Sequence, residues 1–259
     1  MHLLELGGSR VLMDCGLFQG RRAEAGRINR EFPVAPSSID AVLLSHAHMD
    51  HAGLLPRLYA DGFRGKIYAT RATLDLCAVM LADSARIQEK DVEWVNRRER
   101  PQGRDEIKPL YSEEDAEAVL ERFVGVEYRE QFSPLEGLDV EYRDAGHILG
   151  SATMTLAVRE GARTTTLGFT GDVGRPQRPI LRDPEPMPDC DWLICESTYG
   201  GRVHEPAEQA KDHLARIVRE TAARGGKVII PAFAVGRTQE IVFRLDETSA
   251  EEMFPDAVH

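Results

Sequence analysis

The sequence predicts an α/β fold of layered helices and mixed sheets. Short apolar runs alternate with helical patterns through the first third of the chain, and residues 125–170 are rich in the strand-forming residues Val, Thr, Leu and Phe. The 259 residues are 42% hydrophobic and 29% charged, which is ordinary for a globular chain and enough for one large domain or two small ones. A mainly disordered chain is excluded.

Strands dominate the prediction for the N-terminal region. Two apolar runs at 2–6 and 10–14 flank the glycine-rich residues 7–9, which is typical of a hairpin. The continuous apolar run Ala41–Leu44 favours a strand that is buried on both faces. A helix is expected next, from about residue 51 to residue 59.

Further elements are predicted before the strand-rich region. Lys66–Ala69 is expected to be a strand, and a helix from about 72 to 87 places apolar residues at helical spacing. Residues 96–108 are rich in arginine and indicate a solvated loop. Ser112 is followed by three acids and caps a helix that reaches about Phe123, because the hydroxyl and the early acids satisfy the first free N–H groups.

The middle of the chain predicts successive strands within 125–145, at 152–158 and at 164–170. A proline-rich connector follows these strands. The apolar run Trp192–Cys195 then predicts another buried strand.

The last part of the chain predicts a helix, a strand and a second helix. Pro206 opens the first helix and the glycine pair 225–226 closes it. Lys227–Ile230 is expected to be a strand, and the final helix begins near Gly236. Residues 246–259 carry five acids and no base, without apolar periodicity, which predicts a disordered tail.

The chain carries 32 basic and 43 acidic residues, so its net charge is −11. This balance argues against a protein that coats nucleic acid through a global positive field. It does not exclude a local basic groove. No apolar run approaches the roughly 20 residues of a membrane helix. Four separate cysteines fit reduced thiols in the core. We therefore expect a cytoplasmic protein that does not associate with membranes.

Three histidines cluster within six residues, in the sequence Ser45-His46-Ala47-His48-Met49-Asp50-His51. Side chains two apart in an extended chain share a face, so His46 and His48 reach one ion. Asp50 and His51 lie where the chain enters the next helix, and we expect their side chains to reach a second position beside that ion. Imidazole nitrogen and carboxylate oxygen suit Zn²⁺ at roughly 2.0–2.2 Å, and Mn²⁺ with less preference. The segment therefore predicts two adjacent metal positions.

Two further residues complete this prediction. His147 lies in a glycine-flanked loop between predicted strands, and Asp172 ends a strand. Each alone is typical of an ordinary histidine or a turn residue. Together with the histidine cluster they supply a third nitrogen for the first ion and a carboxylate that bridges both ions. Asp14 follows a strand, and we expect it either to orient a metal ligand or to approach the second metal.

The order and spacing of these residues resemble the metal-binding motifs of the metallo-β-lactamase superfamily. The resemblance implies an αββα sandwich. It also implies a ligand set: His46, His48 and His147 for the first zinc, Asp50 and His51 for the second, and Asp172 as the bridge between them.

Two later segments resemble the β-CASP branch of that superfamily, which comprises nucleases such as ribonuclease J and the endonuclease of mRNA 3′-end processing. They are Glu196-Ser197-Thr198-Tyr199-Gly200 and the run from Pro231 to Glu240. The resemblance spans roughly residues 2–245. A glutamate followed by Ser-Thr-Tyr-Gly resembles the RNA-cleaving members more than the DNA-cleaving ones.

The resemblance implies a zinc-dependent phosphodiester hydrolase that acts on RNA and serves RNA processing. Two ions about 4 Å apart lower the pKa of a bridging water and clamp the oxygens of the phosphodiester. The side chains expected to take part in catalysis are Asp50, Asp172 and Glu196. In this branch the glutamate pairs with a histidine that protonates the leaving oxygen.

The chain departs from the β-CASP pattern after Glu196. Members carry an inserted second domain there and then two late histidines, one for the second zinc and one as the general acid. We therefore expect an incomplete sandwich, truncated at both ends, whose second zinc site lacks one histidine. The expected divisions are a metallo-β-lactamase-like domain at 1–200, the beginning of the β-CASP insert at 201–245 and a disordered acidic tail at 246–259.

Two other functions stay open. One is a catalytically defective, metal-binding fragment of such a nuclease. The other is a small-molecule hydrolase of the same superfamily that acts on thioesters or lactones. This alternative explains the short chain but neither residues 196–200 nor the run at 232–237. Single-stranded RNA is the expected partner, bound weakly because the basic cleft of the branch would lie largely outside this chain. The assembly state is open, with a homodimer among the alternatives.

Overall fold

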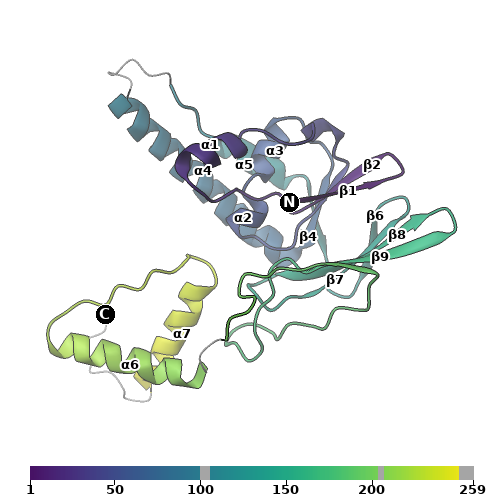
Figure 1. The fold of residues 1–259 in the computed structure, drawn as a ribbon. Helices are drawn as coiled ribbons and strands as arrows, with labels where there is room; N and C mark the ends of the chain where they lie inside the picture. The colour runs from purple at the N-terminus through teal and green to yellow at the C-terminus, as the bar shows by residue number, and fades with distance from the viewer. Residues whose placement is uncertain (100–105, 204–206, 251–259) are drawn as a thin grey trace. The chain divides into compact units, whose positions relative to one another are not determined.

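The structure of the chain, a computed structural model, describes residues 1–99, 106–203 and 207–250 (Figure 1). The chain falls into two units. The larger comprises Met1–Pro176 and Asp183–Glu196, and the smaller comprises Gln177–Arg182 and Ser197–His259. Both five-stranded sheets belong to the larger unit, and each contains parallel and antiparallel pairs, so the predicted α/β class with mixed sheets is confirmed.

The first sheet has the strand order β1-β2-β3-β4-β5. Its strands are β1 (His2–Leu6), β2 (Ser9–Met13), β3 (Ala41–Leu43), β4 (Lys66–Thr70) and β5 (Phe123–Val126). The first two form the predicted antiparallel hairpin, and the turn between them places Gly7 at φ 56° and Gly8 at φ 90°, which glycine adopts without strain. All other neighbours are parallel and need crossover connections.

Helices cover the outer face of this sheet (Figure 1). They are α1 (Arg22–Ile28), α2 (Met49–Ala52), α3 (Leu55–Ala60), α4 (Arg71–Glu99) and α5 (Glu113–Leu120), with a short 3-10 helix at Pro36–Ser38. The predicted cap is confirmed. The Ser112 hydroxyl accepts the N–H of Asp115, and the Asp115 carboxylate accepts the N–H of Ser112.

Two of these helices differ from the prediction. The helix expected at 51–59 is split into α2 and α3, because the N–H of Leu54 donates to the carbonyl of Cys15 instead of continuing the helix. The helix α4 continues to Glu99, beyond the end predicted near residue 87, so residues 96–99 are helical and not part of a loop. Residues 100–105 of the predicted loop lie outside the described residues.

The second sheet has the strand order β10-β9-β8-β7-β6. Its strands are β6 (Gln131–Leu135), β7 (Leu138–Asp144), β8 (Ala152–Glu160), β9 (Arg163–Phe169) and β10 (Trp192–Ile194). Only β9 and β10 pair in parallel. The prediction that the last strand is buried was wrong, because β10 is an edge strand, and Trp192 and Leu193 are 67% and 55% exposed.

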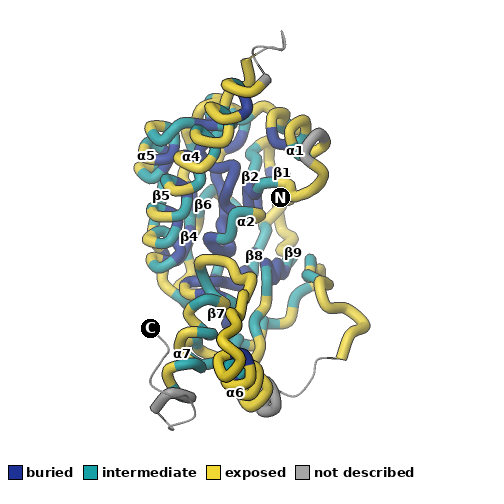
Figure 2. Tube along the Cα trace, turned by 90° about the vertical axis from the view of Figure 1, so that its left-hand side faces the viewer, coloured by how far each residue is buried: buried dark blue, intermediate teal, exposed yellow. Residues whose placement is uncertain are grey.

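One hydrophobic core lies between the two sheets, and Figure 2 shows buried positions along the strands of both. Every second residue of β7 is buried, so Val140 and Tyr142 pack with Val11 and Met13 of the first sheet. The Tyr142 hydroxyl also donates to the carbonyl of Tyr68 at 3.0 Å. The described residues of the larger unit thus form three layers, namely helices, first sheet and second sheet, and this core fixes the strand ends that carry the site.

The four cysteines divide into two groups. Cys15 and Cys77 are buried as predicted, and burial raises the pKa of each thiol. Cys190 is half-buried and Cys195 is exposed, so the prediction of four core thiols was wrong for these two. No helix in the described part of the chain is long and apolar enough to cross a membrane.

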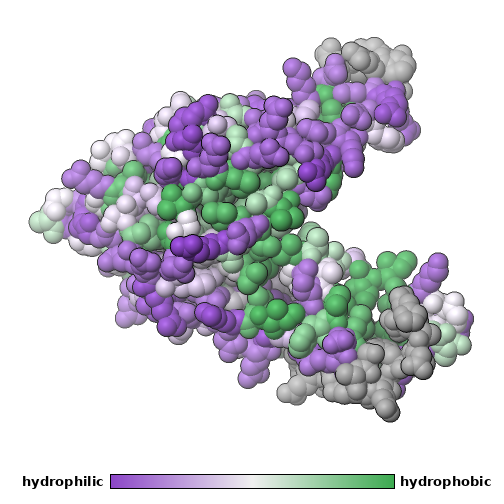
Figure 3. All heavy atoms as spheres, turned by 180° about the vertical axis from the view of Figure 1, so that it is seen from behind, coloured by the Kyte–Doolittle hydropathy of each residue, from purple (hydrophilic) through white to green (hydrophobic). Residues whose placement is uncertain are grey.

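The smaller unit contains α6 (Ala207–Ala223) and α7 (Arg237–Ala250). The strand predicted at 227–230 is not formed. Among the described residues no strand pairs with residues 227–230, and Ile229 is 89% exposed. Figure 3 shows hydrophobic side chains on the surface of this unit, and the exposed ones include Ile217, Val228, Ile229, Ile230, Phe233, Val242 and Phe243.

The end of the chain is partly helical. Residues 246–250 belong to α7, whereas the sequence predicted a disordered tail from residue 246. Residues 251–259 of that tail lie outside the described residues. Pro206, the expected start of the preceding helix, also lies outside them.

Candidate metal centre

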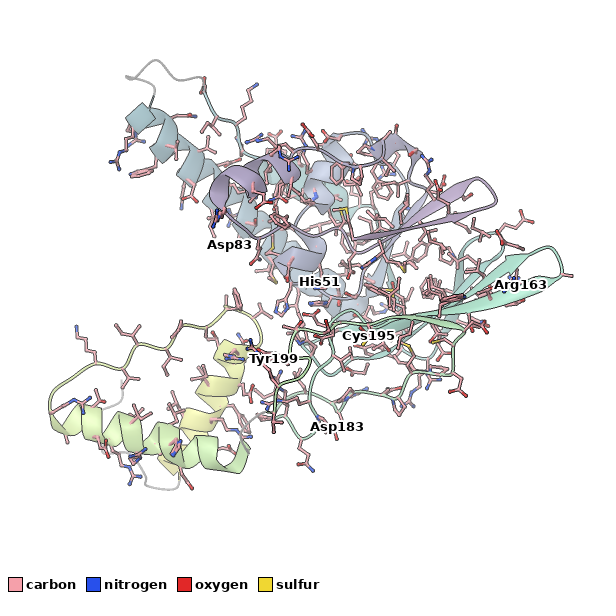
Figure 4. The ribbon with its side chains drawn as sticks, viewed as in Figure 1. His51, Asp83, Arg163, Asp183, Cys195 and Tyr199 are labelled. Atoms are coloured by element: carbon pink, nitrogen blue, oxygen red, sulfur yellow. The ribbon has the colours of Figure 1, made fainter. Side chains whose placement is uncertain are left out.

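The predicted site residues all follow the carboxyl ends of strands. Asp14 follows β2, residues 46–51 follow β3, His147 follows β7, Asp172 follows β9 and Glu196 follows β10. The N–H of Ala152 donates to the carbonyl of Ser45 at 2.8 Å, so the loop after β3 meets the start of β8. Residues from both sheets therefore gather at one edge, where Figure 4 labels His51.

One group of four side chains converges on a single point. Its ligand atoms lie within 4.8 Å of one another and come from His46, His48, His147 and Asp172. Nδ1 of His48 lies 3.1 Å from Nε2 of His46 and 3.1 Å from Nε2 of His147. The Asp172 Oδ2 atom lies 3.9 and 3.6 Å from these two Nε2 atoms. Four ligands about 2.0–2.1 Å from a tetrahedral zinc ion lie about 3.3 Å apart, so the spacing fits one ion.

A second group of ligand atoms adjoins the first. Oδ1 of Asp172 lies 3.3 Å from Nε2 of His51, and Oδ2 of Asp50 lies 3.9 Å from the same nitrogen. Asp172 therefore presents one oxygen to each group, which is the placement that a bridging carboxylate needs.

Asp14 lies behind this second group. Its side chain is buried, and its backbone has φ 57°, which is uncommon for a residue other than glycine. Oδ1 accepts the N–H of Ser45 at 2.7 Å, and Oδ2 lies 2.8 Å from the Ser45 hydroxyl and 2.7 Å from Nδ1 of His51. Of the two roles expected for Asp14, this geometry supports the orientation of a metal ligand.

Glu196 supports the turn that carries Asp172. Its Oε1 atom accepts the N–H of Val173 at 2.9 Å, and its own N–H donates to the Thr170 hydroxyl at 3.1 Å. Both contacts are to residues that flank Gly171 and Asp172. The carboxylate of Glu196 therefore lies at the same edge as the metal ligands.

Sequence analysis missed the residues that hold the loop of His147. The Ser151 hydroxyl accepts the N–H of His147 at 3.0 Å. Thr70 and Thr73, at the junction of β4 and α4, donate their hydroxyls to the carbonyl of Gly150 at 2.7 and 2.8 Å. Ser151 is four residues from His147 and could have been found as a turn-forming serine, but nothing in the sequence connects the two threonines with this loop.

The histidines of the site differ in their electrostatics. Burial lowers the pKa of His46 well below its usual value, and the neighbouring His51, His48 and His147 lower it further. Burial also lowers the pKa of His51, but hydrogen bonds to Asp14 and Asp172 outweigh burial and raise the pKa to about 10. The hydrogen bond from His51 holds the pKa of Asp172 below its usual range. Without metal, a protonated His51 therefore neutralises part of the acidic charge.

We expect the metal-free chain to be most stable near pH 6.5, because this is about the pKa that histidine has in an unfolded chain. Folded His46 resists protonation, so stability falls as the pH decreases below that value. Protonated His51 contributes stability that is fully present below pH 6.5. This contribution is lost as the pH rises toward 10, by up to about 1.4 kcal/mol per pH unit.

Urea unfolding in the presence of EDTA, from about pH 5.5 to about pH 7.5, measures both effects below the range in which unfolded thiols titrate. The variant His51→Gln should lose the decrease above pH 6.5 and keep the decrease below it. A constant stability from about pH 6.5 to about pH 7.5 in the unsubstituted chain would contradict the raised pKa of His51.

The donor set fits a divalent metal ion. Three imidazole nitrogens and a carboxylate are ligands that zinc takes in tetrahedral sites. Two facing mixed sheets with such a ligand group at their strand ends define a metal-binding protein of the α/β class. Residues 3–162 match the metallo-beta-lactamase superfamily domain, and the chain belongs to this superfamily.

Curated relatives include a ribonuclease and transcription termination factors. Ribonuclease TTHA0252 of Thermus thermophilus is 39% identical over 244 residues, which are 94% of this chain and 51% of that protein. Transcription termination factor FttA of Methanosarcina mazei is 32% identical over 261 residues, which cover 98% of this chain and 38% of that protein. The chain thus spans about half, or less, of the length of these relatives.

Solved metallo-beta-lactamases are also similar. A protein of Cronobacter sakazakii with a HARLDQ motif is 18% identical, with a TM-score of 0.41, over 68% of this chain and 54% of that chain.

Proposed function

We propose that this chain carries the metal centre of a zinc-dependent phosphodiester hydrolase that acts on RNA. The observation that carries the proposal is the convergence of three imidazoles and a carboxylate on one point, beside a second ligand pair that shares the same carboxylate. The names of the relatives, a ribonuclease and a transcription termination factor, favour RNA as the substrate.

The proposed ligand sets follow the two groups of atoms. His46, His48, His147 and Asp172 would hold the first zinc, and Asp50, His51 and Asp172 would hold the second. Bound zinc supplies activation of a water molecule and stabilisation of charge on the phosphodiester. Asp172 would set the separation of the two ions, and Asp14 would hold the ring of His51 in place.

We place the chain in the β-CASP branch on the basis of residues 196–200 and 231–240. We place it in the cytoplasm because its four dispersed cysteines fit reduced thiols. Glu196 would then have two tasks. It stabilises the turn of Asp172 through the N–H of Val173, and it would pair with the histidine that protonates the leaving oxygen.

Removal of one ligand of the first ion tests this function. The purified chain should contain about two zinc ions. The His48→Ala variant should retain at most one zinc ion, because the first ion loses a nitrogen ligand. It should cleave 5′-labelled single-stranded RNA at least about 100-fold more slowly than the unsubstituted chain. The control is His213→Ala, which changes an exposed histidine of α6 and should leave metal content and cleavage unchanged. Elemental analysis and gel-based cleavage give the two readouts.

The other outcomes separate the alternatives. One tightly held ion without cleavage would identify a metal-binding chain that lacks nuclease activity. Turnover of a thioester but not of RNA would identify a small-molecule hydrolase. Either result would refute the proposed function.

We also expect weak binding of RNA. The chain should bind single-stranded RNA with a Kd above about 10 μM at physiological salt, because a net charge of −11 gives little long-range attraction to phosphates. Fluorescence anisotropy with labelled RNA measures this Kd. A nanomolar value would contradict the expectation.

A further inference from the structure

Ser45 lies at the centre of the contacts behind the metal ligands. Its hydroxyl is 2.8 Å from Oδ2 of Asp14, 3.0 Å from Nδ1 of His46 and 3.5 Å from Nδ1 of His51. The residue is 1% exposed. Its N–H donates to Asp14, and its carbonyl accepts the N–H of Ala152, so the backbone is held from both sides.

The hydrogen-bonding capacity of these groups fixes the direction of each bond. A carboxylate accepts only, whereas a hydroxyl has one proton to donate and lone pairs that accept. The Ser45 hydroxyl therefore donates to Asp14 and accepts the Nδ1–H of His46. An imidazole that carries its proton on Nδ1 leaves the lone pair on Nε2, which is the atom that faces His48 and Asp172.

We propose that Ser45 is a positioning residue that sets the tautomer of His46, so that Nε2 is presented to the first metal. The inference rests on the proposed function for the identity of the site. Asp14 would then act on both metal positions, on the second directly through His51 and on the first through Ser45.

A second observation shows that the Ser45 side chain is confined. A Cβ atom on Gly171 would lie 2.7 Å from Cβ and 2.8 Å from Oγ of Ser45. Gly171 has φ 51° and directly precedes Asp172. The backbone that carries the bridging carboxylate therefore packs against the serine, and the hydroxyl is kept between Asp14 and His46.

The test uses side-chain nitrogen NMR of the metal-free chain together with zinc affinity. In the unsubstituted chain the ¹⁵N shifts of His46 should show a proton on Nδ1 and none on Nε2. Ser45→Ala should give a mixture of tautomers and weaken zinc binding at the first position by about 10- to 100-fold, measured by competition with a chelator, which is the range known for partners that orient metal ligands.

The control is Ser133→Ala. Ser133 also donates its hydroxyl to an aspartate, Asp139, but it is an exposed residue of the edge strand β6 and contacts no metal ligand in this bond, so tautomer and zinc affinity should not change. Two results would overturn the proposal, namely a proton on Nε2 of His46 in the unsubstituted chain, or a Ser45→Ala variant with an unchanged tautomer and zinc affinity.

The tautomer is read without metal, so it separates this inference from the proposed function. A chain that shows the Nδ1–H tautomer but cleaves no RNA would refute the nuclease and leave the role of Ser45 intact. A chain that cleaves RNA although Ser45→Ala leaves the tautomer and affinity unchanged would refute only the role of Ser45.

Discussion

Asp172→Asn should remove the second metal ion, weaken the first and slow RNA cleavage by at least about 10³-fold. The substitution keeps the shape of the side chain but removes its charge, and a neutral amide bridges two cations poorly. Asp172 presents Oδ1 to His51 and Oδ2 to His46 and His147, so both ligand groups lose a member. A 10³-fold slower cleavage corresponds to a loss of about 4 kcal/mol of transition-state stabilisation, because about 1.4 kcal/mol is a factor of ten in rate.

Elemental analysis and cleavage of labelled RNA measure the effect, with circular dichroism as a check of the fold. The matched control is Asp83→Asn, which changes an exposed aspartate on α4 that Figure 4 labels. It should behave as the unsubstituted chain does. An Asp172→Asn variant that still holds two ions and cleaves at the normal rate would show that Asp172 is not the bridge.

Gly16→Ala should lower the free energy of unfolding by about 3 kcal/mol or more. The new Cβ atom would lie 1.5 Å from the carbonyl oxygen and 1.9 Å from the carbonyl carbon of Asp50. These are backbone atoms that cannot rotate aside, so the strand end and the loop must separate. The hydrogen bonds from Cys15 N–H to His51 and from Leu17 N–H to Met49, at 2.7 and 2.8 Å, would then be lost.

Urea unfolding followed by circular dichroism measures this loss, and Gly26→Ala is the control. Gly26 lies inside α1, and a Cβ atom there meets nothing within 4 Å. Alanine is the better helix former, so this variant should be stabilised by about 0.5–1 kcal/mol. If Gly16→Ala were as stable as the unsubstituted chain, the close approach of residue 16 to the metal-ligand loop would be contradicted.

Local sequence patterns predicted much of the fold. The glycine turn at 7–9 indicated the first hairpin, and Ser112 indicated the start of α5, because turn and cap chemistry act over a few residues. The errors concern burial and pairing, which depend on distant partners. Trp192 and Ile229 lie in apolar runs typical of buried strands, yet one lies on an edge strand and the other has no paired strand beside it among the described residues.

In the site, too, the sequence predicted the local features but not those that depend on packing. The i and i+2 spacing of His46 and His48 predicted that both reach one point, because it depends only on an extended backbone. The spacing did not predict which ring nitrogen each histidine presents, Nε2 for His46 and Nδ1 for His48. That choice depends on packing, and Ser45 was overlooked although it directly precedes His46.

The most direct test of the metal centre is anomalous diffraction at the zinc absorption edge, from crystals of the chain grown with zinc. The structure predicts a strong peak at about 2.0–2.1 Å from Nε2 of His46, Nδ1 of His48 and Nε2 of His147, with Asp172 as the fourth ligand. A map from well-ordered crystals with no peak between these three histidines would contradict the proposed centre.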